Sequence, residues 1–216
     1  SRITKILFFY FKKNGSKKKN MFFTEGVTGC IKILIEAYSQ RKKNNIIVSD
    51  PTFPLYKIFG QLYENKIKKI KYEKNFSLNI NDFIKAIDRN TSIVFLPNPD
   101  SPIDFAFNEN EVNKICKYAS KRKVMVAIDE VYFLFNKKSY LKLINKYNNL
   151  FIMRSFSKVY GLAGIRLGIL FSSKNNIDYI GKFRAGYETN SLSVSIADYI
   201  LSNKNIKNSY LSEIKR

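Results

Sequence analysis

The sequence predicts an α/β protein with three layers, in which helices cover both faces of a mostly parallel central β-sheet. Two observations predict this. Short apolar runs alternate along the chain with segments whose apolar residues recur at helical spacing. Residues 124–128 are almost continuously apolar, as expected for a strand buried on both faces. Alternating strands and helices imply β-α-β units, whose strands run parallel.

The short apolar runs are the expected strands. They are residues 21–24, 45–49, 66–72, 92–96, 124–128, 150–153 and 165–171. In open α/β sheets, ligands bind beyond the carboxyl ends of the strands. The residues that follow each run are therefore the candidates for a functional site.

Helical spacing marks the segments between these strands. Ile31, Leu34, Ile35 and Tyr38 give the segment 27–38 one apolar face. The other expected helices are residues 53–63, a helix that opens at Asn81 with Phe83, Ile84 and Ile87 inward, and residues 108–122, 176–183 and 192–201. Residues 12–20 are polar and turn-like, so we expect a solvated loop there.

Composition excludes several classes of function. The chain has 216 residues and 45% hydrophobic residues, enough for a sizeable core. It has no histidine, which excludes His-based triads and His-ligated metal sites. Cys30 and Cys116 have neither metal-ligand spacing nor the density of a disulfide scaffold. No apolar run approaches the roughly 20 residues of a membrane span, and residues 1–11 lack a signal-peptide cleavage site. We therefore expect a cytoplasmic protein with no membrane partner.

The net charge of +21, from 38 basic and 17 acidic residues, would permit binding to nucleic acid. The lysines are scattered among many asparagines, however, and the aromatic residues occupy apolar periodic positions. The aromatic residues do not interleave with lysines on one face of a β-strand, as is expected of proteins that bind single-stranded nucleic acid. Nucleic acid is therefore the less favoured partner.

Residues 155–168 carry the strongest chemical signal. Lys158 is closely flanked by apolar residues and serines, which suits a partly desolvated amine that forms a Schiff base. Arg166 could bring a positive, forked group towards a phosphate. The alternative interpretation is a basic turn in a lysine-rich protein.

Other strand ends carry weaker signals. The glycine turn at residues 25–29, with Val27 and Thr28, leads into a helix whose N-terminus could bind phosphate. Phe53 could stack on a planar ring or pack in the core. Asp129 ends a buried strand and needs a partner, or serves as a helix cap or in a salt bridge.

Ser-x-Ser-Lys followed by Gly-Leu-Ala-Gly-x-Arg-x-Gly resembles the cofactor-lysine segment of fold-type I pyridoxal-phosphate enzymes. The resemblance is closest to class I/II aminotransferases of the histidinol-phosphate aminotransferase type. Four further segments occur in the family's order: the turn 25–29, Pro-Thr-Phe-x-x-Tyr at 51–56, the loop 98–104 and Asp-Glu-x-Tyr at 129–132. The resemblance runs from about residue 3 to about residue 200.

The resemblance implies a role for each matching residue. Lys158 would hold pyridoxal 5′-phosphate as an internal aldimine and then move a proton between the substrate Cα and the cofactor's C4′, which requires a pKa well below about 10.4. Asp129 would pair with the ring nitrogen and Phe53 would stack on the ring. Tyr132 and Ser101 would contact the phenolic oxygen. The phosphate would be held by Val27, Thr28, Ser155, Ser157 and Arg166.

The loop 98–104 departs from the family's Asn-Pro-Asn-Asn/Ser-Pro-Thr-Gly. Ser101 falls where an asparagine usually contacts the phenolic oxygen, and a serine has a shorter reach. Ile103 and Asp104 replace the usual Thr-Gly. Asp104 therefore puts a β-carbon and a charge where glycine's conformational freedom is expected.

By resemblance, residues 1–200 form the cofactor-binding large domain without the family's N-terminal arm, and residues 201–216 begin a small domain. No residue matches the family's carboxylate-clamping arginine. We therefore expect a fragment, a truncated product or a divergent minimal member. Active sites of this fold form at a dimer interface, so the resemblance also implies a homodimer.

The expected activity is transamination between a small amino donor and a 2-oxo acid. Two alternatives stay open. One is a decarboxylase of a phosphorylated amino acid, which Arg184 and Asn190 would suit. The other is a catalytically inactive homologue.

Overall fold

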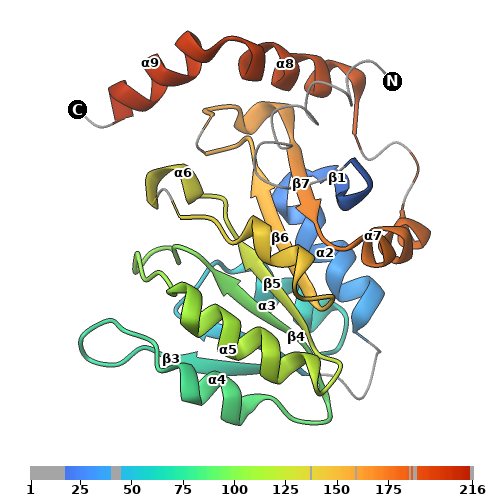
Figure 1. The fold of residues 1–216 in the computed structure, drawn as a ribbon, viewed down its shortest axis with the longest axis vertical. Helices are drawn as coiled ribbons and strands as arrows, with labels where there is room; N and C mark the ends of the chain where they lie inside the picture. The colour runs from blue at the N-terminus through green and yellow to red at the C-terminus, as the bar shows by residue number, and fades with distance from the viewer. Residues whose placement is uncertain are drawn as a thin grey trace.

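A computed structural model describes residues 18–39, 45–136, 138–158, 160–184, 186 and 189–214. In this part of the chain one seven-stranded sheet forms, with strand order β1-β7-β6-β5-β4-β2-β3 (Figure 1). The strands are β1 (Met21–Glu25), β2 (Asn45–Asp50), β3 (Lys66–Lys71), β4 (Thr91–Pro97), β5 (Met125–Asp129), β6 (Leu150–Ser155) and β7 (Leu167–Phe171).

The sheet is mostly parallel, as predicted. β2 pairs in parallel with β3 and β4, and β4, β5 and β6 continue in parallel order. β7 runs antiparallel to both of its neighbours, β1 and β6. Since β7 begins at the edge where the parallel strands end, the residue before it, Arg166, joins their carboxyl ends.

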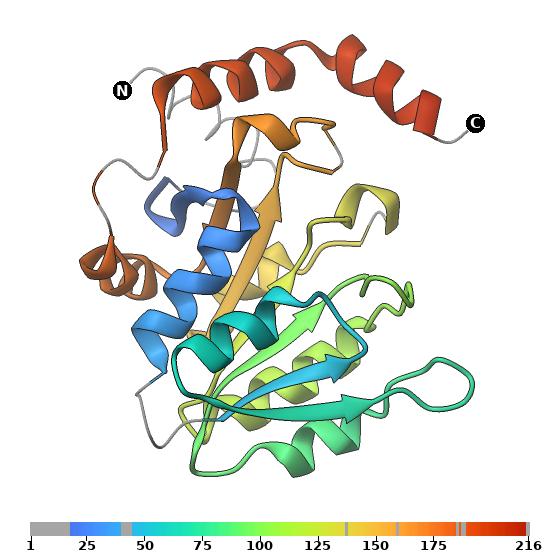
Figure 2. The same cartoon turned by 180° about the vertical axis from the view of Figure 1, so that it is seen from behind.

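Helices cover both faces of the sheet (Figures 1 and 2). On one face lie α2 (Gly26–Tyr38), α3 (Leu55–Leu62) and α7 (Lys174–Ile180). On the other lie α4 (Ile80–Ala86) and α5 (Glu109–Ser120). Helix α8 (Ser191–Ser202) adds residues to the same core cluster but lies across the end of the sheet in both views (Figures 1 and 2). Shorter elements and a last helix complete the described chain: η1 (Lys18–Asn20), α6 (Phe133–Asn136), η2 (Leu141–Asn145), η3 (Ala163–Ile165), η4 (Gly181–Phe183) and α9 (Lys204–Ile214).

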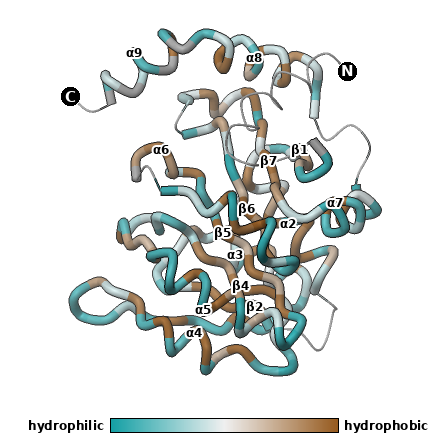
Figure 3. The backbone as a smooth tube through the Cα atoms, viewed as in Figure 1, coloured by the Kyte–Doolittle hydropathy of each residue, from teal (hydrophilic) through white to brown (hydrophobic). Residues whose placement is uncertain are grey.

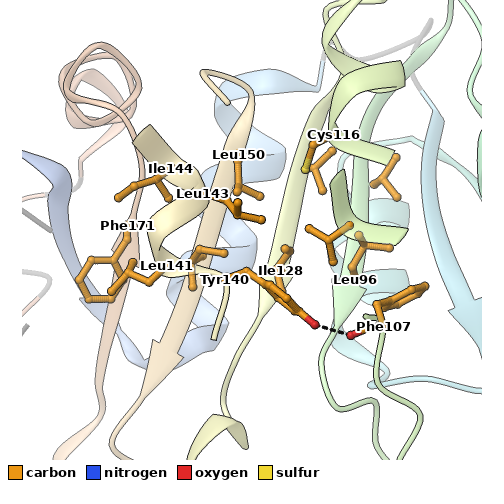
Figure 4. Close-up of a cluster of buried hydrophobic side chains, with 14 of the residues drawn as sticks. Leu96, Phe107, Cys116, Ile128, Tyr140, Leu141, Leu143, Ile144, Leu150 and Phe171 are labelled. Carbon is orange, nitrogen blue, oxygen red and sulfur yellow. Dashed lines mark hydrogen bonds between the residues drawn. The ribbon is translucent and has the colours of Figure 1, made fainter. Parts of the chain in front are cut away.

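Alternate residues of the central strands supply the two cores. In β4, Val94 and Leu96 belong to the cluster under α5, whereas Ile93 and Phe95 belong to the cluster under α2, and all four are fully buried. The central strands are accordingly the apolar centre of the molecule (Figure 3). Figure 4 shows part of the first cluster, where the Tyr140 hydroxyl donates to the Phe107 carbonyl.

Two helix starts show what the sequence does and does not specify. Asn108 and Glu111 form a capping box at the start of α5, with 3.0 Å and 2.8 Å hydrogen bonds, close to the predicted start. The prediction that Asn81 opens the helix before α5 is wrong by one residue. α4 begins at Ile80, and the cap is Asn79, whose side chain accepts from the Asn81 N–H.

Other boundaries also differ from the prediction. Strand β7 starts at Leu167, because residues before it form the turn η3 and Arg166 adopts a left-handed φ of 50°. Residues 12–17 of the expected solvated loop lie outside the described residues. Asn20, at its end, is buried and donates to the Ser172 carbonyl at 2.7 Å.

Two further sequence-based statements concern domains and membranes. The division into residues 1–200 and 201–216 stays a prediction; α8 ends at Ser202 and α9 begins at Lys204. Within the described ranges, every helix is too short or too polar to cross a membrane.

Candidate functional site

A pocket of about 390 Å³ lies at the carboxyl ends of the parallel strands. All ten residues singled out from the sequence line it: Val27, Thr28, Phe53, Ser101, Asp129, Tyr132, Ser155, Ser157, Lys158 and Arg166. The topology explains why. Each of these residues ends or follows β1, β2, β4, β5 or β6, or precedes the antiparallel strand β7.

One end of the pocket is formed by the N-terminus of α2. Glu25, the residue before the helix, makes no side-chain cap hydrogen bond, so the first-turn N–H groups have no acceptor from it. Arg166 lies beside this turn, and its carbonyl accepts from the Gly26 N–H at 3.1 Å. Amide groups, the positive helix end and a guanidinium together can hold a phosphate-sized anion.

The approach of α2 to β7 depends on a glycine. A β-carbon at Gly168 would lie 2.4 Å from the carbonyl carbon and oxygen of Gly26. Such a contact is far below the van der Waals distance, so a larger residue would displace the helix N-terminus. Gly168 therefore sets the position of the anion end of the pocket.

Lys158 lies in the turn that follows β6. The Ser155 Oγ accepts from the Ser157 N–H at 3.0 Å, and the Lys158 carbonyl accepts from the Gly161 N–H at 3.1 Å. The apolar neighbour Phe156 is buried, but Lys158 itself is exposed. The apolar flank therefore anchors the turn and does not cover the amine, contrary to the desolvation expected from the sequence.

Asp129 lies deep in the pocket, with only 7% of its surface exposed. The Tyr56 hydroxyl donates to its Oδ2 at 2.6 Å, and the Val131 N–H donates to its Oδ1 at 3.0 Å. Burial raises the pKa of Asp129 to about 6; these two bonds oppose the rise, and the charges of Asp100 and Glu130 add to it. A cationic partner would relieve this cost.

The middle of the pocket is aromatic. The Phe53 ring is 38% exposed and lies edge-on to Tyr56, with ring centroids 5.8 Å apart. Tyr132 is half-buried, and Ser101 is exposed. A planar heteroaromatic ring could contact all three while an acidic group on it reached the N-terminus of α2.

The loop after β4 closes despite its departures from the family pattern. Asp104 adopts a left-handed φ of 60°, and its N–H donates to the Asp100 carbonyl at 2.8 Å. Aspartate tolerates this conformation better than most residues. Asp104 thus occupies the conformation expected of the glycine it replaces.

Among the lining residues that sequence reasoning missed, two carry polar side-chain groups, Tyr56 and Asp100. Tyr56 ends the Pro-Thr-Phe-x-x-Tyr segment, which could have indicated it. Arg184 and Asn190, considered for a phosphorylated substrate, are not among the lining residues. The Arg184 guanidinium lies 5.0 Å over the Phe22 ring, and Asn190 caps α8.

Comparison with known proteins shows what the chain is similar to. The family model described as aminotransferase class I and II matches residues 3–216. The histidinol-phosphate aminotransferase of Flavobacterium johnsoniae is 33% identical over 182 residues, which is 84% of this chain and 51% of that protein. The chain spans about half the length of the curated relatives it matches.

Solved structures share the fold. The histidinol-phosphate aminotransferase of Sinorhizobium meliloti, determined in complex with pyridoxal-5′-phosphate, superposes with a TM-score of 0.86 at 18% identity, covering 96% of this chain and 56% of that one. The L-threonine-O-3-phosphate decarboxylase of Porphyromonas gingivalis gives a TM-score of 0.77 at 20% identity, covering 95% and 62%.

Proposed function

The chain belongs to the class I and II aminotransferase family, and from this premise we propose that it is a pyridoxal-phosphate-dependent aminotransferase. The substrates are an amino acid or amino-phosphate as donor and a 2-oxo acid as acceptor. The observation that carries the proposal is the convergence of residues from six strand termini on one pocket.

The pocket fits the cofactor's chemical groups. The α2 amides at Val27 and Thr28, with Arg166 and the hydroxyls of Ser155 and Ser157, would hold the phosphate. When bound, the cofactor supplies a protonated ring that withdraws electrons from the substrate Cα. Asp129, which is buried and accepts from the Tyr56 hydroxyl and the Val131 N–H, would hold the proton on the ring nitrogen.

The remaining residues would orient the ring and move the proton. Phe53 would cover one ring face, and the hydroxyls of Tyr132 and Ser101 would donate to the phenolic oxygen. The Lys158 Nζ would bond the cofactor and later carry the proton removed from the substrate Cα. The contact from Ser101 would be the weakest of these, because its side chain is short.

The proposal extends to a cytoplasmic homodimer. Helix α3, which follows Phe53, exposes Ile58 (51%) and Leu62 (68%), an apolar face that a second copy would cover. Cys30 and Cys116 are both buried thiols, which suits a reducing compartment. Sedimentation equilibrium would test the dimer; a monomer at micromolar concentration would argue against it.

The test of the cofactor site is direct. Add pyridoxal 5′-phosphate, record the visible absorption band, reduce with borohydride and map the adduct by mass spectrometry. We expect one adduct on Lys158 that is lost in Lys158→Ala. Lys85→Ala, which removes an exposed lysine on α4, is the matched control and should keep the adduct. Adducts spread over surface lysines would contradict the proposal.

Product analysis separates the possible reactions. With an amino donor and a 2-oxo acid, transamination yields a new amino acid and releases no carbon dioxide. Carbon dioxide released from a phosphorylated amino acid would instead identify a decarboxylase. A labelled Lys158 without either product would identify a catalytically inactive homologue.

A further inference from the structure

Asp100 is a buried carboxyl at the pocket that the proposed function does not use. It lies in the loop after β4 and is 2% exposed. Three hydroxyls donate to it: Thr52 to Oδ1 at 3.0 Å, and Ser49 and Tyr72 to Oδ2. Burial raises the pKa of Asp100, and the three hydroxyls oppose that rise because a carboxylate can accept from all of them at once.

The donors come from neighbouring parts of the sheet. Ser49 lies near the end of β2, Thr52 lies in the turn before α3, and Tyr72 directly follows β3. β4, β2 and β3 are adjacent strands. The Asp100 carboxyl therefore joins the carboxyl ends of three strands. In the chain, Asp100 is next to Ser101, and its partner Thr52 is next to Phe53.

Asp100 is also close to Asp129 in the fold. Pro97 pairs with Asp129 across β4 and β5, and the Asn98 N–H donates to the Asp129 carbonyl at 2.8 Å. Both carboxyls line the same pocket. Burial raises the pKa of the Tyr56 phenol, and Asp129 and Asp100 each raise it further, which shows that both carboxyls lie near this hydroxyl. Two buried carboxyl groups thus lie at adjacent strand ends.

We propose that Asp100 is a positioning residue whose buried charge acts together with Asp129 to hold a cationic ring nitrogen in the pocket. This inference rests on the proposed function. The hydrogen bonds between Asp100 and its hydroxyl partners also fix the backbone next to Phe53 and Ser101, two residues that would contact the ring. Asp100 itself is too buried to touch the substrate.

The other charged groups around the two carboxyls are consistent with this role. Glu130, next to Asp129, adds negative charge, but it is paired with Arg154 at 2.8 Å. Lys158 and Arg166 also line the pocket. Without a cation at Asp129, two buried carboxylates repel each other; a protonated ring nitrogen would relieve that repulsion.

The first experiment uses Asp100→Asn in the cofactor-loaded 216-residue chain. The amide keeps the shape of the side chain and removes the charge. Since a negative charge favours protonated, cationic groups, its loss should lower the pH midpoint of the visible band by about one unit. The dissociation constant for pyridoxal phosphate should rise about tenfold.

Asp88→Asn is the matched control. Asp88 also accepts from a hydroxyl, that of Thr91, and pairs with Lys68, but it lies before β4 and away from the pocket. It should leave the midpoint unchanged. Tyr72→Phe removes one donor to Asp100, and it should move the midpoint in the same direction by a smaller amount. An unchanged midpoint in both Asp100→Asn and Tyr72→Phe would overturn the inference.

A second measurement needs no cofactor. Carboxyl carbon NMR of the cofactor-free protein follows Asp129, whose resonance is assigned by its loss in Asp129→Asn. Asp100→Asn should lower the titration midpoint of Asp129, because a like charge is removed. If wild type fails to form the Lys158 adduct, the proposed function fails, and the NMR result still decides whether Asp100 acts on Asp129.

Discussion

Asp129 couples the state of the pocket to pH. Its carboxyl is almost completely buried, and the hydroxyl of Tyr56 and the Val131 N–H are its hydrogen-bond donors. Burial outweighs these bonds and raises its pKa to about 6. A group whose pKa is raised in the folded state stabilises the fold below its unfolded pKa and loses that contribution as pH rises through the folded value.

We therefore expect the free energy of unfolding of the cofactor-free protein to fall as pH rises from about 4 to about 6. Asp129 should account for about 3 kcal/mol of that fall. Asp129→Asn cannot ionise and should lack this part of the pH dependence. Urea denaturation of both proteins between pH 4 and pH 7 measures the difference; parallel curves would show that Asp129 titrates normally.

The residues that the sequence could identify are those in contiguous segments. Lys158 and Asp129 each lie within a short pattern that follows a strand. Asp100 could not be identified in this way, because its partner Ser49 is 51 positions away in the chain. The contact between Tyr56 and Asp129 spans 73 positions. Only the fold brings such hydroxyl and carboxyl groups together.

At the scale of elements, a buried ion pair connects two strand ends. Arg154 in β6 donates to Glu130 Oε2 through Nε at 3.0 Å and Nη2 at 2.8 Å. Glu130 Oε1 accepts from the Tyr140 N–H at 2.6 Å, and the guanidinium lies 3.8 Å over the Phe133 ring. Asp129 is next to Glu130 in the chain and Ser155 is next to Arg154, so this ion pair fixes Asp129 relative to Ser155. From the sequence alone, Glu130 and Arg154 look like ordinary surface residues.

Apolar runs predicted the strands well but not the turn before β7. Ile165 continues the apolar pattern, yet it belongs to η3, and the left-handed Arg166 separates it from β7. Helix α9 was missed because its segment is mostly polar, with apolar residues too sparse for a helical face. Hydrophobic periodicity reports burial and says little of turns.

Gly168→Ala tests how β7 positions α2. The new methyl would meet the Gly26 backbone at 2.4 Å, so the helix N-terminus must shift. We expect a loss of about 1–3 kcal/mol in the free energy of unfolding and weaker binding of pyridoxal phosphate. Gly181→Ala is the control, because nothing lies within 4 Å of its added β-carbon. Equal stability of the two variants would mean that α2 and β7 do not constrain each other.

At the scale of the molecule, the alternation of strands and helices predicts the layer order, whereas the pocket depends on six strand termini that meet at one edge of the sheet. The anion end, the ring region and Lys158 come from segments spread between residues 27 and 166. No one segment could bind the cofactor alone. Binding should therefore stabilise the whole fold and raise its melting temperature.

Pyridoxal phosphate at 100 times its dissociation constant contributes about 2.7 kcal/mol to stability. For a chain of 216 residues this corresponds to a rise of about 5–10 °C in melting temperature. Pyridoxal at the same concentration lacks the phosphate that the α2 amides and Arg166 would bind, so its shift should be much smaller. Arg166→Gln should reduce the shift with pyridoxal phosphate and leave that with pyridoxal unchanged. Scanning calorimetry measures the shift in melting temperature with each ligand. Equal shifts with the two ligands would show that the N-terminus of α2 and Arg166 do not recognise the phosphate.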